Sequence, residues 1–187
     1  MNAVNLQEQQ AILAGAAQEL SMLQASFTAA MRHFASAVSV VTVEHQGQRS
    51  GFTATSVSSF CASPPTVLIS TKQTSSSAQL LQGAKRFAVN LLAPEHQAIA
   101  QRFTGFRGET GEERYAKAQW LEHEDGGAPV LADSLVALDC EVDEILERHG
   151  HLLIFGRVCA IHAPAQVVQQ APLIYWQGQY RQLGAGL

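Results

Sequence analysis

Short β-branched segments, separated by turn residues at near-regular intervals, constrain the fold of this chain most. Residues 37–45 (AVSVVTVEH) predict a strand, and Gln46-Gly47-Gln48 predicts the turn that follows it. Two further strands are expected at 51–59 and 66–70, with Pro64-Pro65 between them, because proline excludes a helix there. Many short strands and few helices favour an all-β barrel with helical additions.

The rest of the chain continues this pattern of short elements and turns. Strands are predicted at 87–92, at 135–146 with a bulge near 144–145, and at 151–162. A closing hairpin is predicted at 173–176 and 180–183. Short helices are predicted at 78–82, 94–102 and 112–117. No repeat or linker divides them, so one main domain is expected.

Residues 5–35 are predicted to form a helix that precedes the barrel. A stripe of apolar residues at seven-residue spacing runs along it, made of Leu6, Leu13, Leu20, Phe27 and Phe34 with Ala16, Leu23 and Ala30. Such a stripe packs against a partner, either the protein's own barrel or another subunit. Gly15 is a candidate break between two helices. We expect a helical extension at 1–25 and the main domain at 26–187.

Composition excludes several classes of function. Hydrophobic residues make up 47% of the 187 residues and charged residues 15%, which indicates that part of the surface is an interface. A net charge of −4 without a basic run argues against nucleic-acid binding. No apolar run is long enough to span a bilayer, and no signal peptide is recognisable. The three widely spaced cysteines, Cys61, Cys140 and Cys159, indicate a reduced, cytoplasmic protein.

Residues 50–80 have an unusual composition. Fourteen of these thirty-one residues are Ser or Thr, and Lys72 is the only charged one. Many neutral donors, one cation and no acid suit the phosphate of a bulky cofactor. A Ser/Thr-rich edge sheet with a loop explains the same composition.

Common cofactor and catalytic motifs are missing from the sequence. It has no strand–GxGxxG–helix unit, P-loop, GxSxG, HExxH or CxxC. His149 and His151 could share a metal from one face of a strand, but no third ligand is near in sequence, so no metal site is predicted.

The chain resembles the flavin reductase family in GFTATSVSSFCASPPTVLIS at 51–70, the Lys-x-x-Ser-Ser-Ser loop that follows, and RFAVNLL at 86–92. The likeness covers about residues 26–183 and continues through FTAAMRHFASAVSVVTV, AIAQRFTG, GEERYAKAQW, ALDCEVDEI, HGHLLIFGRV and LIYWQGQY. The EERY segment and the LIYW ending are most similar to the reductase components of two-component aromatic monooxygenases, particularly the 4-hydroxyphenylacetate 3-monooxygenase type.

This resemblance implies a mainly β fold, the FMN-binding split barrel, which is a Greek-key-like six-stranded barrel with flanking helices. It implies a homodimer with FMN or FAD bound at or near the subunit interface. The implied flavin-binding residues are Thr53, Ala54, Thr55 and Ser56 at the ring and ribityl chain, Ser70, Thr71, Lys72, Ser75, Ser76 and Ser77 at the phosphate, and Phe103 and Gly105 nearby. Two simpler explanations remain: the serines at 75–77 would also cap a helix, and Phe103 would also serve as a core residue.

The resemblance places His151 where the nicotinamide cofactor docks over the flavin. Many members carry Gly-Asp-His at this point, whereas this chain has His149-Gly150-His151, so the histidine is kept and the acid is lost. A histidine that merely ends a strand is the simpler alternative.

The function implied is NAD(P)H:flavin oxidoreduction, in which NADH or NADPH gives a hydride to flavin N5 and the reduced flavin goes to a partner oxygenase. The cofactors would supply this chemistry, so no catalytic triad is expected. Two alternatives remain: a non-catalytic flavin- or haem-binding carrier or sensor, and an enzyme like pyridoxamine-phosphate oxidase.

Overall fold

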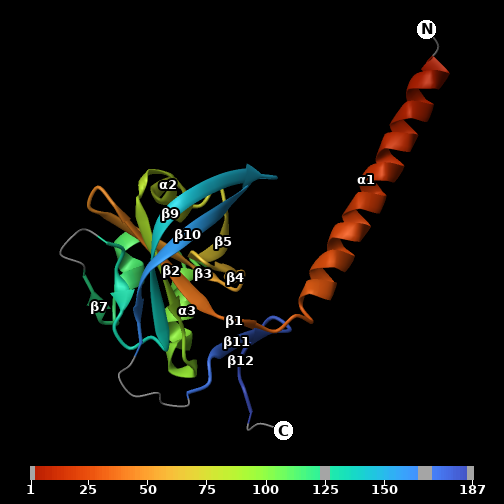
Figure 1. Ribbon diagram of the computed structural model, residues 1–187. Coiled ribbons are helices and arrows are strands. Elements are labelled where there is room, and N and C mark those ends of the chain that lie inside the picture. Colours follow the sequence, from red (N-terminus) through yellow and green to blue (C-terminus); the bar gives the residue numbers. More distant parts are fainter. Residues whose placement is uncertain (1–2, 123–126, 164–169, 185–187) are drawn as a thin grey trace. The chain divides into compact units, whose positions relative to one another are not determined.

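The computed structural model describes residues 3–122, 127–163 and 170–184, with side chains from residue 12 onward. The chain divides into two compact units. One contains helix α1 (Ala3–Met31), the turn to Ala35 and Trp176–Gln179, and the other contains the remaining helices and nearly all the strands (Figure 1).

Helix α1 is a single uninterrupted helix of 29 residues. The predicted break at Gly15 is wrong, because one glycine costs only about 1 kcal/mol in a long helix that is otherwise rich in Ala, Leu and Gln. The helix ends at Met31, earlier than the predicted 35. There the amide of His33 donates to the carbonyl of Ala30, three residues back, which closes the last turn.

The second unit is built on a seven-stranded sheet in the order β3-β2-β6-β9-β10-β5-β4, with antiparallel pairing throughout. Its strands are β2 (Ser39–His45), β3 (Gln48–Ala54), β4 (Ser58–Ala62), β5 (Pro65–Lys72), β6 (Arg86–Leu91), β9 (Val136–Arg148) and β10 (His151–His162). The last two form a long hairpin (Figure 1). The mainly β fold predicted from the sequence is therefore confirmed.

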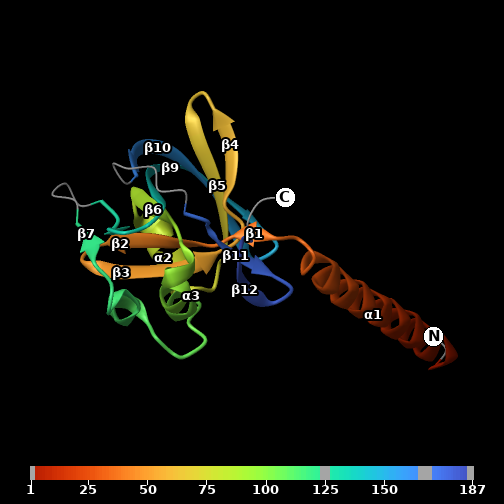
Figure 2. The same cartoon turned by 90° about the horizontal axis from the view of Figure 1, so that it is seen from below.

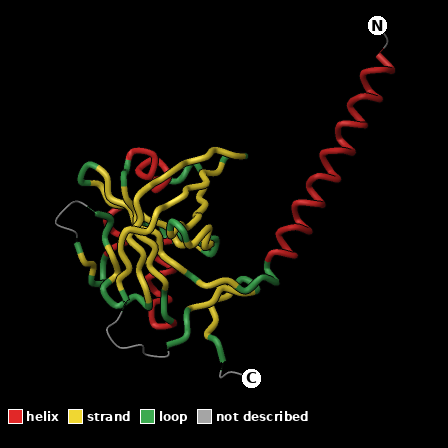
Figure 3. The backbone as a smooth tube through the Cα atoms, viewed as in Figure 1, coloured by secondary structure: helices red, strands yellow, loops and turns green. Residues whose placement is uncertain are grey.

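Smaller elements complete the chain. They are the strands β1 (Ser36–Ala37), β7 (Trp120–Leu121), β8 (Val130–Leu131), β11 (Leu173–Trp176) and β12 (Gln179–Gln182), the helices α2 (Ser76–Gly83) and α3 (Gln97–Phe103), and the 3-10 helices η1 (Pro94–His96) and η2 (Gly111–Tyr115). Figure 3 shows how short these two α-helices are beside the strands.

The predicted strand at 51–59 is wrong as a single element. The chain bends at Thr55, and the two halves belong to β3, which pairs with β2, and β4, which pairs with β5. This division makes β4 a separate strand at one edge of the sheet. The predicted bulge in the 135–146 strand is confirmed: Val142 pairs with Gly156 and Glu144 with Phe155, so Asp143 is the extra residue.

The core lies between the sheet and the helices α2 and α3, which contact β2 and β3 (Figure 2). One close approach depends on a glycine. A Cβ atom on Gly156 would lie 2.2 Å from Cζ of Phe87, so only glycine lets β10 pack against that buried ring.

Candidate functional site

Three basic side chains form a row across three neighbouring strands. Lys72 at the end of β5 lies opposite His151 of β10, and His151 lies opposite Arg148 of β9. Residues directly opposite each other in antiparallel strands project to the same face, about 5 Å apart. All three are exposed. We call these three residues the basic row.

Charge around the basic row is not neutralised by nearby acids. Among the described residues, neither Lys72 nor Arg148 forms an ion pair with a carboxylate. The nearest acid in sequence, Glu147, accepts hydrogen bonds from the side-chain amides of Gln73 (3.0 Å) and Gln82 (3.2 Å). The cations are therefore available to an external anion.

Hydroxyl groups lie next to the basic row. Ser70 is two residues before Lys72 on β5, so its side chain shares the same face, and it pairs with Leu153 of β10. The hydroxyl of Ser56 donates to the carbonyl of Ser70 at 3.5 Å. The structure thus brings Ser56, Ser70, Lys72 and His151 together, although they come from distant parts of the sequence.

The first turn of α2 holds the next predicted group. Ser75 is the N-cap, and its hydroxyl accepts from the amide of Ala78 at 3.1 Å and lies 3.3 Å from the hydroxyl of Thr71. Ser77 is fully buried, and its hydroxyl donates to the carbonyl of Gly51 at 2.9 Å. The helix-capping alternative is therefore confirmed for Ser75, and the Ser77 hydroxyl is engaged inside the protein.

The other predicted flavin residues differ in their exposure. Thr53 donates to the carbonyl of Ala100 at 2.5 Å, Ala54 is buried, and Thr55 is exposed at the bend after β3. Phe103 is 1% exposed and belongs to the core. Gly105 has φ +71°, a conformation that glycine adopts at little cost.

A second cationic corner, which sequence reasoning missed, surrounds Arg49. Its guanidinium contacts three carboxylates: Glu44 (2.8 Å), Glu122 (2.8 Å) and Glu112 (3.6 Å). Burial lowers the pKa of Arg49, but hydrogen bonds to Glu122 and Glu44 outweigh this and raise it, so the group stays charged. In contrast to Lys72, Arg49 is saturated by acids.

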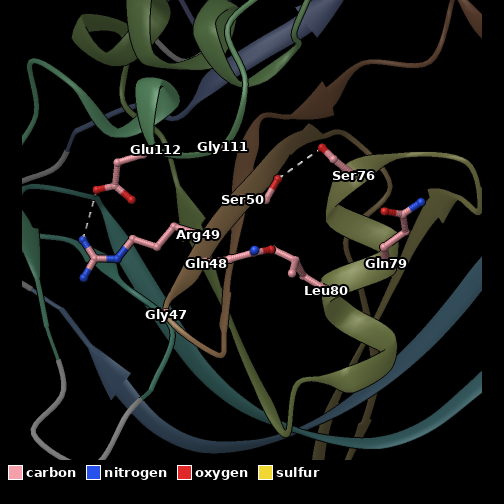
Figure 4. A pocket seen from close by; sticks show the side chains of 9 residues that line it. All are labelled: Gly47, Gln48, Arg49, Ser50, Ser76, Gln79, Leu80, Gly111 and Glu112. Atoms are coloured by element: carbon pink, nitrogen blue, oxygen red, sulfur yellow. Dashed lines mark hydrogen bonds and ion pairs between the residues drawn. The ribbon is translucent and has the colours of Figure 1, made fainter.

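Arg49 also lines a pocket of about 380 Å³ (Figure 4). Its lining residues are Gly47, Gln48, Arg49, Ser50, Ser76, Gln79, Leu80, Gly111 and Glu112. The hydroxyls of Ser50 and Ser76 approach to 3.4 Å at its wall. Of the predicted site residues, only Ser76 lines this pocket, so the pocket and the basic row are different places.

Two kinds of feature are absent from the described residues. No group of three His, Cys, Asp or Glu residues in this part of the chain could hold a metal ion. No helix in it is long and apolar enough to cross a membrane.

The antiparallel sheet with its flanking helices carries hydroxyl groups and two exposed cations, Lys72 and Arg148, at the ends of β5 and β9, an arrangement that suits an anionic ligand. The family model described as "Flavin reductase like domain" matches residues 31–184. The chain therefore belongs to the flavin reductase family. The predicted family, the split-barrel fold and the enzyme class, an NAD(P)H:flavin oxidoreductase, are confirmed.

Named relatives agree with this family. The chain is 34% identical over 166 residues to "FMN reductase (NADH) RutF" of Ancylobacter novellus, covering 89% of this chain and 88% of that protein. It is 29% identical to the "Flavin-dependent monooxygenase, reductase subunit HsaB" of Rhodococcus jostii, covering 82% and 75%. The solved NADH:FAD oxidoreductase SgcE6 of Streptomyces globisporus C-1027 superimposes with a TM-score of 0.76 at 25% identity, covering 88% and 90%.

Arg148 is the residue of the basic row that sequence reasoning did not single out. It precedes the His149-Gly150 turn, and both turn residues have positive φ, which makes the hairpin tight. In a two-residue hairpin the flanking residues must pair. That rule was the available signal that Arg148 and His151 are neighbours.

Proposed function

We propose that this chain reduces a flavin with NADH and passes the reduced flavin to a separate oxygenase component, and that its cofactors bind at the basic row. The observation that carries this proposal is the register that puts Lys72 beside His151. A flavin phosphate and a nicotinamide dinucleotide are both anionic, and both must approach one place for a reaction between them. Two cations without carboxylate partners, Lys72 and Arg148, beside hydroxyls suit two such ligands.

Our proposal for the flavin uses the residues on and beside this row. Lys72 would hold the phosphate, with hydroxyls of Ser70 and Ser76 and the first N–H groups of α2. Thr53, Ala54, Thr55 and Ser56 would line the ring and ribityl chain. Thr71, Ser75 and Ser77 would act by shaping the turn of α2, and Phe103 and Gly105 by supporting the wall from within.

The flavin and the nicotinamide supply the hydride chemistry when they are bound, so the protein needs no acid–base group of its own for it. We propose that His151 orients the nicotinamide and that Arg148 contacts the phosphates of the dinucleotide. Both side chains are exposed and extend the row beyond Lys72. The protein's part is to bind, to orient and to exclude water.

A homodimer is part of this proposal. The face of β5 and β10 that carries Ser70 also carries Leu68, Leu153 and Phe155, all of them half-buried in one chain. Phe60 of the edge strand β4 is 60% exposed and contacts the ring of Phe155, with centroids 5.0 Å apart. An apolar face of this kind is typical of a subunit interface.

The proposed partner is an oxygenase that acts on an aromatic substrate and takes up the reduced flavin. The name of HsaB, a reductase subunit of a flavin-dependent monooxygenase, supports such a pairing. We also propose a cytoplasmic location, which is supported by the three cysteines, all of which are free thiols.

Steady-state oxidation of NADH and NADPH with added FMN or FAD tests the activity directly. We expect rapid turnover with at least one flavin and a lower KM for NADH than for NADPH. A protein that binds flavin without oxidising either dinucleotide would instead be the carrier or sensor considered above. Turnover of pyridoxine phosphate would support the third class.

One variant distinguishes a residue that binds the dinucleotide from the residues that bind the flavin. Arg148→Gln should raise the KM for NADH by about threefold, a modest loss because the side chain is exposed, and should leave the flavin Kd unchanged. Glu147→Gln is the control, because its side chain projects from the other face of β9. An unchanged KM in Arg148→Gln would remove that residue from the proposal.

A further inference from the structure

Helix α1 exposes a continuous apolar seam. Leu13, Leu20 and Phe27 recur at seven-residue spacing, and Leu23 follows Leu20 after three residues. These four side chains are between 56% and 70% exposed. Spacings of seven and three residues are those of the a and d positions of a coiled coil.

Interactions between side chains on the rest of the α1 surface do not account for the stability of the helix in water. Glu19 is the only charged residue between 12 and 31, so no ion pair links successive turns. Most of the stability of a protein helix comes from packing an apolar face rather than from helix propensity. The seam is therefore the surface that needs a partner.

A helix of similar length can cover this seam along its whole extent. At about 1.5 Å per residue, the 29 residues of α1 extend about 43 Å. Within the described residues the other α-helices, α2 and α3, have only 8 and 7 residues. The flavin reductase model matches residues 31–184, so nearly all of α1 lies before the matched segment.

We propose that α1 pairs lengthwise with α1 of a second copy of this chain. A second copy supplies a helix of equal length with the same a and d spacing, and one Glu19 per helix brings little repulsion. This interface is separate from the barrel face proposed above, and α1 adds a second junction between copies.

Cysteine cross-linking of the full-length protein tests this pairing. In a Cys61→Ser, Cys159→Ser background, in which the remaining Cys140 is fully buried, Leu20→Cys places a thiol in the seam. Mild oxidation should convert most of the chain to a disulfide-linked dimer on a non-reducing gel. Gln18→Cys, about 170° around the helix from the seam, should cross-link at least about tenfold more slowly.

Either of two results would overturn the proposal. One is a Leu20→Cys chain that stays unlinked, as it would if α1 covered the protein's own barrel or bound a different protein. The other is equal cross-linking of Leu20→Cys and Gln18→Cys, which indicates random collision.

A second pair of variants tests the seam without relying on the cysteine position alone. Adding Phe27→Glu to the Leu20→Cys protein puts a charge into the seam and should slow cross-linking by about tenfold or more. Adding Ala25→Glu, on the opposite face, should leave the rate unchanged. NADH oxidation with added flavin should be equal in these two proteins and in the Leu20→Cys and Gln18→Cys proteins. Equal activity would show that the barrel is folded in all four. Equal cross-linking rates in the two charged variants would contradict the pairing.

Discussion

Arg49 and Lys72 are both cations beside serine-rich segments, yet their surroundings are opposite. Arg49 contacts three carboxylates and its side chain is 20% exposed, whereas Lys72 is exposed and lies in a row with two other basic residues. Removing a cation that is saturated by acids leaves those acids unpaired, whereas a cation without acids is available to a ligand. The sequence around each residue does not reveal this difference, because the acids near Arg49 come from three separate segments.

The largest expected effect concerns the saturated corner. Arg49→Met leaves Glu44 and Glu122 without their hydrogen-bond donor. The free energy of unfolding should fall by about 2–3 kcal/mol, less than the roughly 3–5 kcal/mol for a fully buried pair, because Glu122 is 67% exposed. Denaturant unfolding measures it. The flavin Kd should stay within about twofold.

Arg107→Met is the matched control for Arg49→Met, because Arg107 is exposed and makes one hydrogen bond to Gln101. Its stability should change by less than about 0.5 kcal/mol. If Arg49→Met kept its stability and lost flavin binding, the roles of the two corners would be reversed.

The next effect concerns the available corner. Lys72→Ala should weaken flavin binding by about 1–3 kcal/mol, the range for losing a charge-assisted contact, with almost no change in stability. Fluorescence titration of FMN and FAD gives both Kd values. Lys85→Ala, also exposed but outside the basic row, should bind flavin normally. Equal Kd values for Lys72→Ala and wild type would remove the phosphate contact.

Alkaline pH should lower the free energy of unfolding through the ring of Tyr115, which neighbours Arg49. Burial raises the pKa of Tyr115, whose hydroxyl donates to the carbonyl of Ser50 at 2.5 Å. A pKa raised in the folded state means that its stabilisation is complete below about pH 10 and is lost as the pH rises further. Burial also raises the pKa of Cys140, to about 12. Its contribution to stability is likewise lost as the pH rises, starting at about pH 9.

We therefore expect the free energy of unfolding to fall above about pH 9, and Tyr115→Phe to remove up to about 1.4 kcal/mol per pH unit of that slope above pH 10. Thermal unfolding between pH 8 and pH 11 measures the slope. Tyr175→Phe is the control, because Tyr175 lies more than a third exposed in another part of the barrel unit. Identical slopes in wild type and Tyr115→Phe would contradict the buried hydroxyl.

The smallest expected effect concerns the middle of the basic row. His151→Ala should raise the KM for NADH by about two- to tenfold, the loss of one hydrogen bond, and leave the flavin Kd and the fold unchanged. Steady-state kinetics at saturating flavin measures it. His149→Asn changes the adjacent turn residue while tolerating its positive φ, and should have a normal KM. A normal KM in His151→Ala would favour a histidine that only begins a strand.

Strand prediction succeeded where a local pattern marks both ends. The expected strand at 151–162 begins after Gly150 and matches β10, and 173–176 matches β11 before the Gln177-Gly178 turn. It failed at 51–59, where one β-branched run is divided between two strands that pair with different neighbours. It also missed β7 and β8, whose two residues each are too short to show a period.

The sequence by itself determined the β-rich class, the helix at the N-terminus, the hydroxyl-rich segment and the resemblance to flavin reductases, because these depend on local propensity and on residues in linear order. Only the tertiary structure decided that Lys72, His151 and Arg148 form one row, that Arg49 is neutralised, and that the hydroxyl of Ser77 points inward. The physical reason is that strand register and burial are set by pairing between distant segments, and the availability of a charge depends on which of those segments supplies its partners.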